Sequence, residues 1–313
     1  RSTLFPYTTL FRSGFSLFLM AYTLKFGQSV TSTGGVDARA WIYLGSTSFQ
    51  PSELVKIGFI VTFATHLSFL HERDLLKSPL QVILLGVHAA IPIALTHAQG
   101  DDGAGMIFFC IFLVMSFCAG VQLRYFLILF LVLCAAFPIA WKYVLADYQK
   151  QRILVAYNLD ASYENVIHYG WQQFQARTSI GSGGIYGRGM FTSPRVNSKI
   201  VPEQESDMIF SVVGEEFGFV GCCVILLLLV LLLLRTIHIA RKCPDFLGKA
   251  ICMGFLGLVA SQLTLNLAMC LDLLPVTGVT LPFMSYGGSS LVSSYATIGL
   301  LQGLAGVYEH DDG

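Results

Sequence analysis

Long apolar stretches recur along this chain and alternate with short polar segments. A helix needs about 20 largely apolar residues to cross about 30 Å of hydrocarbon. Seven stretches approach that length, and a shorter apolar stretch, 14–26, is part of an eighth candidate. The seven are 52–70, 81–97, 104–119, 123–142, 208–234, 250–270 and 284–307. The pattern predicts an all-α fold, a polytopic transmembrane helical bundle.

The distribution of Lys and Arg predicts the orientation of the bundle, because basic residues in short connections stay on the cytoplasmic side. One alternating set of connections is basic, namely 71–79, 120–124 and 235–249, whereas 98–103 and 271–283 contain no Lys or Arg. The second set is therefore expected to face outward, together with 27–51 and the long polar segment 143–207. The prediction is a large extracytoplasmic loop before the last three helices.

Composition supports a membrane protein. Of the 313 residues, 54% are hydrophobic and only 12% are charged, against roughly 25% charged in a soluble domain. The mean hydropathy is +0.66. These values exclude an ordinary cytosolic enzyme. The 19 basic residues balance the 19 acidic ones, so no net field attracts nucleic acid.

The first residues differ sharply in composition from the apolar stretch that follows. The segment RSTLFPYTTLFRS (1–13) resembles read-through of a sequencing adapter, and we expect it to be an artefact outside the fold. Residues 14–313 are then expected to form a single integral membrane domain.

Glu53 and Lys56 stand at the outer mouth of the first long apolar stretch, three residues apart and so on one helical face. Charges at the edge of a membrane span are costly and usually face a cavity or a partner. Two interpretations remain open here. The two residues form a local ion pair in which Lys56 reaches the interface, or the lysine is held near a phosphate or carboxylate.

Asp207 lies where the long polar segment enters the 208–234 stretch. An acid at a helix start favours capping, but Ser206 and Glu205 are available for the same task. A carboxylate at a water–lipid boundary is also well placed for a raised pKa, which suits a general base. Further along, Glu215 and Glu216 are expected to make structural hydrogen bonds rather than a proton path.

Several motifs, taken in order, resemble the SEDS family (shape, elongation, division and sporulation), which includes RodA, FtsW and SpoVE. They are GVDARAW (35–41), FQPSELVK (49–56), QGDDG (99–103), YQKQRI (148–153), GWQ (170–172), IGSGGIYGRG (180–189), VPEQESDMIFSVVGEEFGFVG (201–221) and LLPVTGVTLPFMSYGGSSL (273–291). Two departures are visible. QGDDG replaces the more usual QPDLG, and Glu205-Ser206 stands where His-Thr often precedes the key aspartate, which leaves the subfamily open.

The resemblance implies a peptidoglycan glycosyltransferase that uses lipid II and works in the membrane beside a class B penicillin-binding protein. Family members have ten transmembrane helices, so this chain is expected to lack the first two and part of the third. Asp207 matches the essential outer-loop aspartate, and Glu53 and Lys56 match the acid and the lysine near it. The positions that match motif segments around the outer cavity are expected to bind substrate: Arg39, Trp41, Gln50, Ser52, Arg152, Gln172, Ser182 and Ser285.

The reaction implied joins a sugar hydroxyl to an anomeric carbon that carries a lipid pyrophosphate. It needs a base on one side and positive charge on the other. We expect Asp207 to be the base and Lys56, alone or with Arg39 or Arg152, to stabilise the pyrophosphate, with Glu53 orienting Lys56. A divalent cation, Mg²⁺ or Mn²⁺, is a further possibility, although the sequence has no dedicated ligand cluster.

Two other functions remain open from the sequence. A lipid II flippase is also a polytopic bundle with intramembrane charges, but a carrier is expected to hold its site near mid-membrane. Here Lys56 and Asp207 lie at the predicted outer face. A non-catalytic scaffold of the cell-wall machinery would tolerate replacement of Asp207. Polymerisation is the favoured function, and elongation, division and sporulation are not distinguished.

Overall fold

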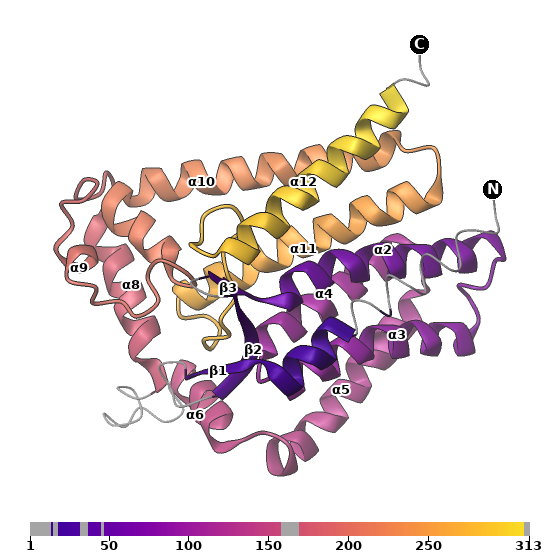
Figure 1. The fold of residues 1–313 in the computed structure, drawn as a ribbon, viewed down its shortest axis with the longest axis horizontal. Helices are drawn as coiled ribbons and strands as arrows, with labels where there is room; N and C mark the ends of the chain where they lie inside the picture. The colour runs from indigo at the N-terminus through magenta and orange to yellow at the C-terminus, as the bar shows by residue number, and fades with distance from the viewer. Residues whose placement is uncertain (1–13, 15–17, 32–36, 45–46, 158–168, 310–313) are drawn as a thin grey trace.

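The fold is helical, with a small sheet at one end (Figure 1). This computed structural model describes residues 14, 18–31, 37–44, 47–157 and 169–309. The prediction made for 1–13 lies outside the described residues. The long helices are α2 (Pro51–Glu72), α3 (Pro79–Ala98), α4 (Asp102–Cys118), α5 (Leu123–Tyr143), α10 (Ile209–Lys242), α11 (Phe246–Cys270) and α12 (Gly288–Glu309). Among the described residues between α5 and α10 lie the shorter helices α6 (Asp147–Ala156), α8 (Trp171–Gly183) and α9 (Pro194–Asn197).

The helix starts follow local sequence signals. Proline occupies the first turn of α2 and of α3, where its missing N–H costs nothing. The carboxylate of Asp101 accepts from Ala104 N at the start of α4, and Asp245 accepts from Gly248 N at the start of α11. These aspartates satisfy backbone donors that a helix start otherwise leaves unpaired.

The predicted transmembrane character holds in the structure. Within the described residues, five helices are long and apolar enough to cross a membrane: α2, α3, α5, α10 and α11. The apolar helix α4 has 17 residues. The observed helices cover all seven predicted apolar stretches, with ends shifted by a few residues. The chain is a multi-pass membrane protein.

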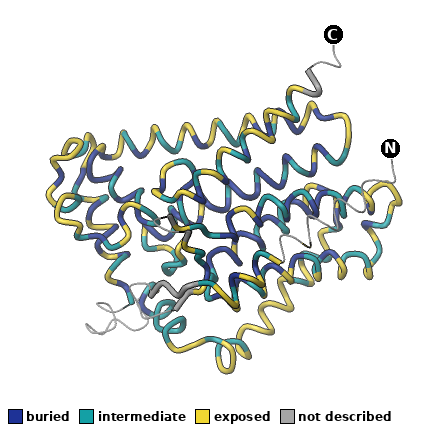
Figure 2. The backbone as a smooth tube through the Cα atoms, viewed as in Figure 1, coloured by how far each residue is buried: buried dark blue, intermediate teal, exposed yellow. Residues whose placement is uncertain are grey.

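Helix α11 is at the centre of the bundle, packed between α2, α4 and α10. Figure 2 shows this helix as largely buried along its length. Close packing depends on Gly254, because an added Cβ there would lie 2.4 Å from Ile60 Cγ2 and 2.9 Å from Met115 Sδ. Small residues of this kind allow membrane helices to approach closely.

Helix α10 is interrupted at Gly218, whose φ of 67° and ψ of −163° are not helical. The break is bonded to the loop after α8, since Phe219 N donates to Gly184 O and Val220 N donates to Ile185 O. The apolar run 208–234 predicts one continuous helix. The structure instead gives a short helix up to Gly218 and a long apolar helix after it.

Residues 28–31, 37–44 and 47–49, expected only as part of an outer loop, form a three-stranded antiparallel sheet. The strands are β1 (Gln28–Thr31), β2 (Asp37–Leu44) and β3 (Thr47–Phe49), in the order β1-β2-β3. Trp41 pairs with Gln28 and Ile42 pairs with Phe49. Because β3 ends one residue before Gln50, which caps α2, the sheet leads directly into the Glu53 and Lys56 segment.

The basic connections lie together at one end of the bundle, and the connections without Lys or Arg lie together at the other end. At one end His71 stacks on Phe246, with ring centroids 3.9 Å apart, and Tyr125 Oη donates to Lys77 O at 2.8 Å. At the other end Arg39 N donates to Gln99 O at 2.9 Å. The sheet and the 271–287 loop also lie at this second end (Figure 1).

Candidate active site

A buried ion pair lies in the first two turns of α2. Lys56 Nζ donates to Glu53 Oε1 at 2.8 Å, and the side chains are only 1% and 7% exposed. The backbone oxygen of Glu53 accepts from Ser293 Oγ of α12 at 3.0 Å. The ion pair considered in the sequence analysis is therefore present, but it is buried and does not reach out to the interface. A lysine so placed is held by its partner in one position.

Asp101, in the turn between α3 and α4, is bonded to residues at the start of α2, close to this pair. Its Oδ2 accepts from Gln50 Nε2 at 2.8 Å and from Ser52 Oγ at 3.4 Å. Burial raises the pKa of Asp101, against the lowering effects of the Ala104 N–H, the Lys56 ammonium and the Gln50 amide. Two predicted substrate-binding residues, Gln50 and Ser52, therefore contact a carboxylate that sequence reasoning had not assigned to the site.

The backbone around Asp207 is fixed by α11 and by the loop that follows it. Asn266 Nδ2 of α11 donates both to Asp207 O and to Val279 O, each at 2.7 Å. Ser285 Oγ donates to Ser206 O at 2.7 Å. These bonds join the segment before α10 to the 271–287 loop, which gives the aspartate a defined position.

The side chain of Asp207 lies against Gly278, since a Cβ added to that glycine would be 3.5 Å from Asp207 Oδ2. Gly278 has a φ of 71°, a conformation that L-residues with side chains rarely adopt. The pKa of Asp207 is raised to about 7, first by burial and then by the nearby carboxylates of Glu203, Asp101 and Glu53. Asp207 is thus in electrostatic range of the α2 and α3–α4 carboxylates.

This arrangement is suited to proton transfer near neutral pH. A general base works best when its pKa is close to the working pH, and Asp207 meets this condition. Neighbouring carboxylates disfavour its ionised form, so a proton taken up there is retained more strongly than by an ordinary aspartate. Lys56 supplies a fixed positive charge next to Glu53 and Asp101.

The structure distributes the other predicted substrate residues around the same end of the molecule. Arg152 Nη1 of α6 donates to Val276 O at 3.3 Å, and Gln172 Nε2 of α8 donates to Pro202 O at 3.2 Å. Both bonds reach segments that flank Gly278 or Asp207. Arg39 and Trp41 are alternate residues of β2 and so share one face of the strand; the Arg39 side chain is exposed.

Two predicted residues have structural contacts of their own. Ser285 Oγ, besides its bond to Ser206 O, accepts from Leu281 N at 2.7 Å, so it closes a turn and supports the Asp207 segment. Ser182 Oγ donates to Ser179 O within α8 at 2.9 Å. Ser285 is therefore bonded to the backbone next to Asp207, whereas the bond of Ser182 lies within its own helix.

Glu215 and Glu216 support the outer loop. Glu215 Oε1 accepts from Arg195 N at 3.1 Å, and Glu216 Oε1 accepts from Phe191 N at 3.0 Å. Both residues precede the break at Gly218, and both are buried. The expectation of structural hydrogen bonding agrees with these contacts.

Sequence reasoning missed Asp101, Asn266 and Gly278 as parts of the site. Asp101 lay in a recognised motif, but its contact with Gln50 joins residues 51 positions apart. Asn266 carried a usable signal, because a polar side chain in an apolar helix usually marks a specific partner. For a metal, the described residues contain no group of three or more His, Cys, Asp or Glu side chains arranged to hold an ion. The divalent cation stays a prediction.

Comparison with known proteins supplies an independent view. The family of cell cycle proteins that contains FtsW, RodA and SpoVE matches residues 2–309. The chain is 29% identical to the peptidoglycan glycosyltransferase RodA of Treponema pallidum, over 95% of this chain and 82% of that protein. It is 35% identical to the stage V sporulation protein E of Bacillus subtilis, over 91% of this chain and 75% of that protein.

Solved structures agree with these relatives. A chain of a peptidoglycan synthase complex that coordinates polymerization and crosslinking superimposes with a TM-score of 0.78 and 29% identity, over 95% of this chain and 80% of that one. The rod shape determining protein RodA of Thermus thermophilus superimposes with a TM-score of 0.65 and 27% identity, over 96% of this chain and 78% of that one.

Proposed function

This chain belongs to the family of cell cycle proteins that contains FtsW, RodA and SpoVE, and from that membership we propose that it is a peptidoglycan glycosyltransferase. Its reaction polymerises lipid II into glycan strands during cell-wall synthesis. Two relatives named as peptidoglycan glycosyltransferases support the reaction class. The observation in this chain that carries the proposal is the Asp207 carboxyl, which lies against Gly278 and has a pKa of about 7. It is in electrostatic range of the carboxylates of Glu203, Asp101 and Glu53, and Glu53 holds Lys56.

In the proposed reaction Asp207 acts as general base. A sugar hydroxyl of one lipid-linked disaccharide attacks the anomeric carbon of the other sugar chain, and the hydroxyl proton passes to the Asp207 carboxylate. The new glycosidic bond forms as the bond to the lipid pyrophosphate breaks. General base catalysis of this kind contributes about 10²–10⁴-fold to a rate.

The departing pyrophosphate needs positive charge, because it gains negative charge as the bond breaks. Lys56 is proposed to supply this charge, with Arg152 and Arg39 as further cations at the same end of the molecule. Glu53 orients Lys56 through their 2.8 Å hydrogen bond. A divalent cation, Mg²⁺ or Mn²⁺, stays a prediction, and no step is assigned to it.

The bundle also suits the proposed substrate. A prenyl chain can remain in the lipid while its head group reaches the end of the bundle that carries the cluster. We assign the protein to the bacterial cytoplasmic membrane with this end extracytoplasmic, because the connections at the opposite end are the basic ones. A class B penicillin-binding protein is the proposed partner, which would crosslink the strands. The synthase complex among the structural relatives supports this pairing.

The test of the proposed function is polymer formation from purified lipid II by the full chain in detergent micelles. Micelles have no second leaflet, so a flippase has no reaction to perform there, whereas a polymerase still makes glycan strands. Strands are separated by gel electrophoresis and digested with a muramidase to prove their identity. We expect a ladder of digestible strands. If the folded protein forms no strands in micelles but moves lipid II across vesicle membranes, the proposal is wrong.

A further inference from the structure

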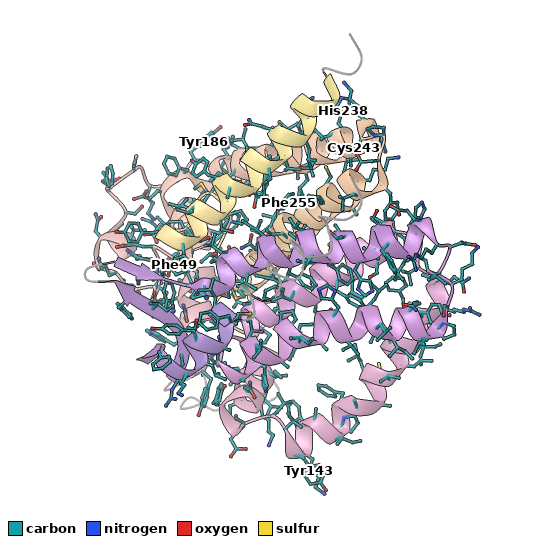
Figure 3. The ribbon with its side chains drawn as sticks, turned by 45° about the vertical axis from the view of Figure 1, so that its right-hand side comes forward. Phe49, Tyr143, Tyr186, His238, Cys243 and Phe255 are labelled. Atoms are coloured by element: carbon teal, nitrogen blue, oxygen red, sulfur yellow. The ribbon has the colours of Figure 1, made fainter. Side chains whose placement is uncertain are left out.

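Helices α5 and α6 form an arm that makes few contacts with the rest of the bundle. None of the 21 residues of α5 is buried, and Figure 2 shows the helix as exposed along most of its length. In Figure 3 Tyr143, at the end of α5, projects away from the other helices. Helix α6 begins four residues later and is less exposed, with Val155 buried.

Within the part of the chain that the structure describes, the side chains of Gln149 and Arg152 bond α6 to other segments. Gln149 Nε2 donates to Asp102 Oδ2 at 2.6 Å, and Gln149 Oε1 accepts from Ala146 N at 3.0 Å. Arg152 Nη1 donates to Val276 O, in the loop that places Gly278 against Asp207. Gln149 and Arg152 are three residues apart and share one face of α6. The helix thus touches the α3–α4 turn and the 271–287 loop at once.

Asp102 is the residue on which these contacts converge. Its Oδ1 lies 2.6 Å from His97 Nδ1 of α3, its Oδ2 holds Gln149, and its charge acts on Arg152. Asp101, its neighbour, faces the other way, toward Gln50 and Ser52. Asp101 therefore bonds to the start of α2, whereas Asp102 bonds to α6. Asp102 also stands where the SEDS motif usually has leucine.

We propose that Asp102 is a positioning residue that holds α6 in place and, through Gln149 and the shared face of the helix, keeps Arg152 on the loop beside Asp207. Asp102 itself does not touch the reacting atoms. Its removal releases the outer end of the arm and moves a cation away from the site. The link to catalysis rests on the proposed function, whereas the link to α6 does not.

The first test measures the exchange of α6 backbone amides with deuterium in the full chain in detergent. Asp102→Leu restores the residue usual in the motif and removes both acceptors, so we expect residues 150–156 to exchange about tenfold faster than in the wild type. Asp102→Asn keeps an acceptor for Gln149 and should retain the protection. Asp147→Asn is the matched control, because Asp147 is on α6 but pairs with Lys150 of the same helix. Unchanged exchange in Asp102→Leu would overturn the proposal.

The second test measures polymerisation at varied lipid II concentration. We expect Asp102→Leu to lower kcat/KM about tenfold, because Arg152 serves both binding and departure of the pyrophosphate, and Asp147→Asn to leave kcat/KM unchanged. Faster α6 exchange without a change in kcat/KM would overturn the role in positioning Arg152. If the wild type makes no strands at all, the proposed function fails, and the exchange experiment alone decides whether Asp102 holds α6.

Discussion

The Glu53–Lys56 pair allows stability and catalysis to be separated. Both side chains are almost fully buried and joined by one 2.8 Å bond. Removing one partner leaves the other charge buried without compensation, which costs about 3–5 kcal/mol. We therefore expect Lys56→Met and Glu53→Gln each to lower the melting temperature by on the order of 10 °C, taking roughly 2–4 °C per kcal/mol for a larger domain.

The double variant Glu53→Gln/Lys56→Met gives the decisive comparison. It removes both charges while nearly conserving volume, and such replacements are often neutral for stability. Its melting temperature, followed by intrinsic tryptophan fluorescence in detergent, should be closer to that of the wild type than either single variant is. Polymerisation of lipid II should nevertheless remain at least about 100-fold reduced, because the fixed cation is gone. A double variant that polymerises normally, or single variants that melt like the wild type, would refute this reasoning.

Three further predictions concern Asp207 and its supports. Because the carboxylate must be ionised to accept a proton and its pKa is about 7, kcat/KM should fall below pH 7, to about one tenth of its plateau at pH 6; a profile flat from pH 5 to 8 would contradict this. Asn266→Ala removes the donor to two backbone carbonyls. We therefore expect the free energy of unfolding to fall by about 2–4 kcal/mol and the activity to fall with it. An unchanged melting temperature would count against this prediction. Gly278→Ala adds a methyl group 3.5 Å from Asp207 Oδ2 at a φ of 71°, which should lower the free energy of unfolding by about 1–2 kcal/mol. Because the carboxyl loses water, the acid limb of the pH profile should move to higher pH. An acid limb at lower pH would be inconsistent with this prediction.

The long helices could be predicted from the sequence because the length of an apolar run is a direct physical requirement of a membrane span. The break in α10 could not be predicted in the same way. Gly218 is one of several glycines in an apolar stretch, and its non-helical backbone depends on hydrogen bonds from the loop after α8. Nothing local to the run distinguishes it from a glycine inside a regular helix.

The site was only partly predictable for a similar reason. Glu53 and Lys56 are close in sequence, so helical spacing was enough to pair them. The contacts of Asp101 with Gln50 and of Asn266 with Asp207 join segments about 50 to 60 residues apart. Such contacts depend on how α2, α4, α10 and α11 pack, and this packing cannot be derived from a single sequence.

Polymerisation of lipid II by Asp207→Asn shows whether the Asp207 carboxylate accepts the proton of the attacking hydroxyl. The variant keeps the shape of the side chain and removes the base. The folded state raises the pKa of Asp207 above its ordinary value, so ionisation above pH 7 disfavours the folded wild type, and the neutral variant should melt at least as high at pH 8. We predict a normally folded protein whose polymerisation rate is at least about 100-fold below that of the wild type. Strand synthesis at the wild-type rate by this variant would contradict the account.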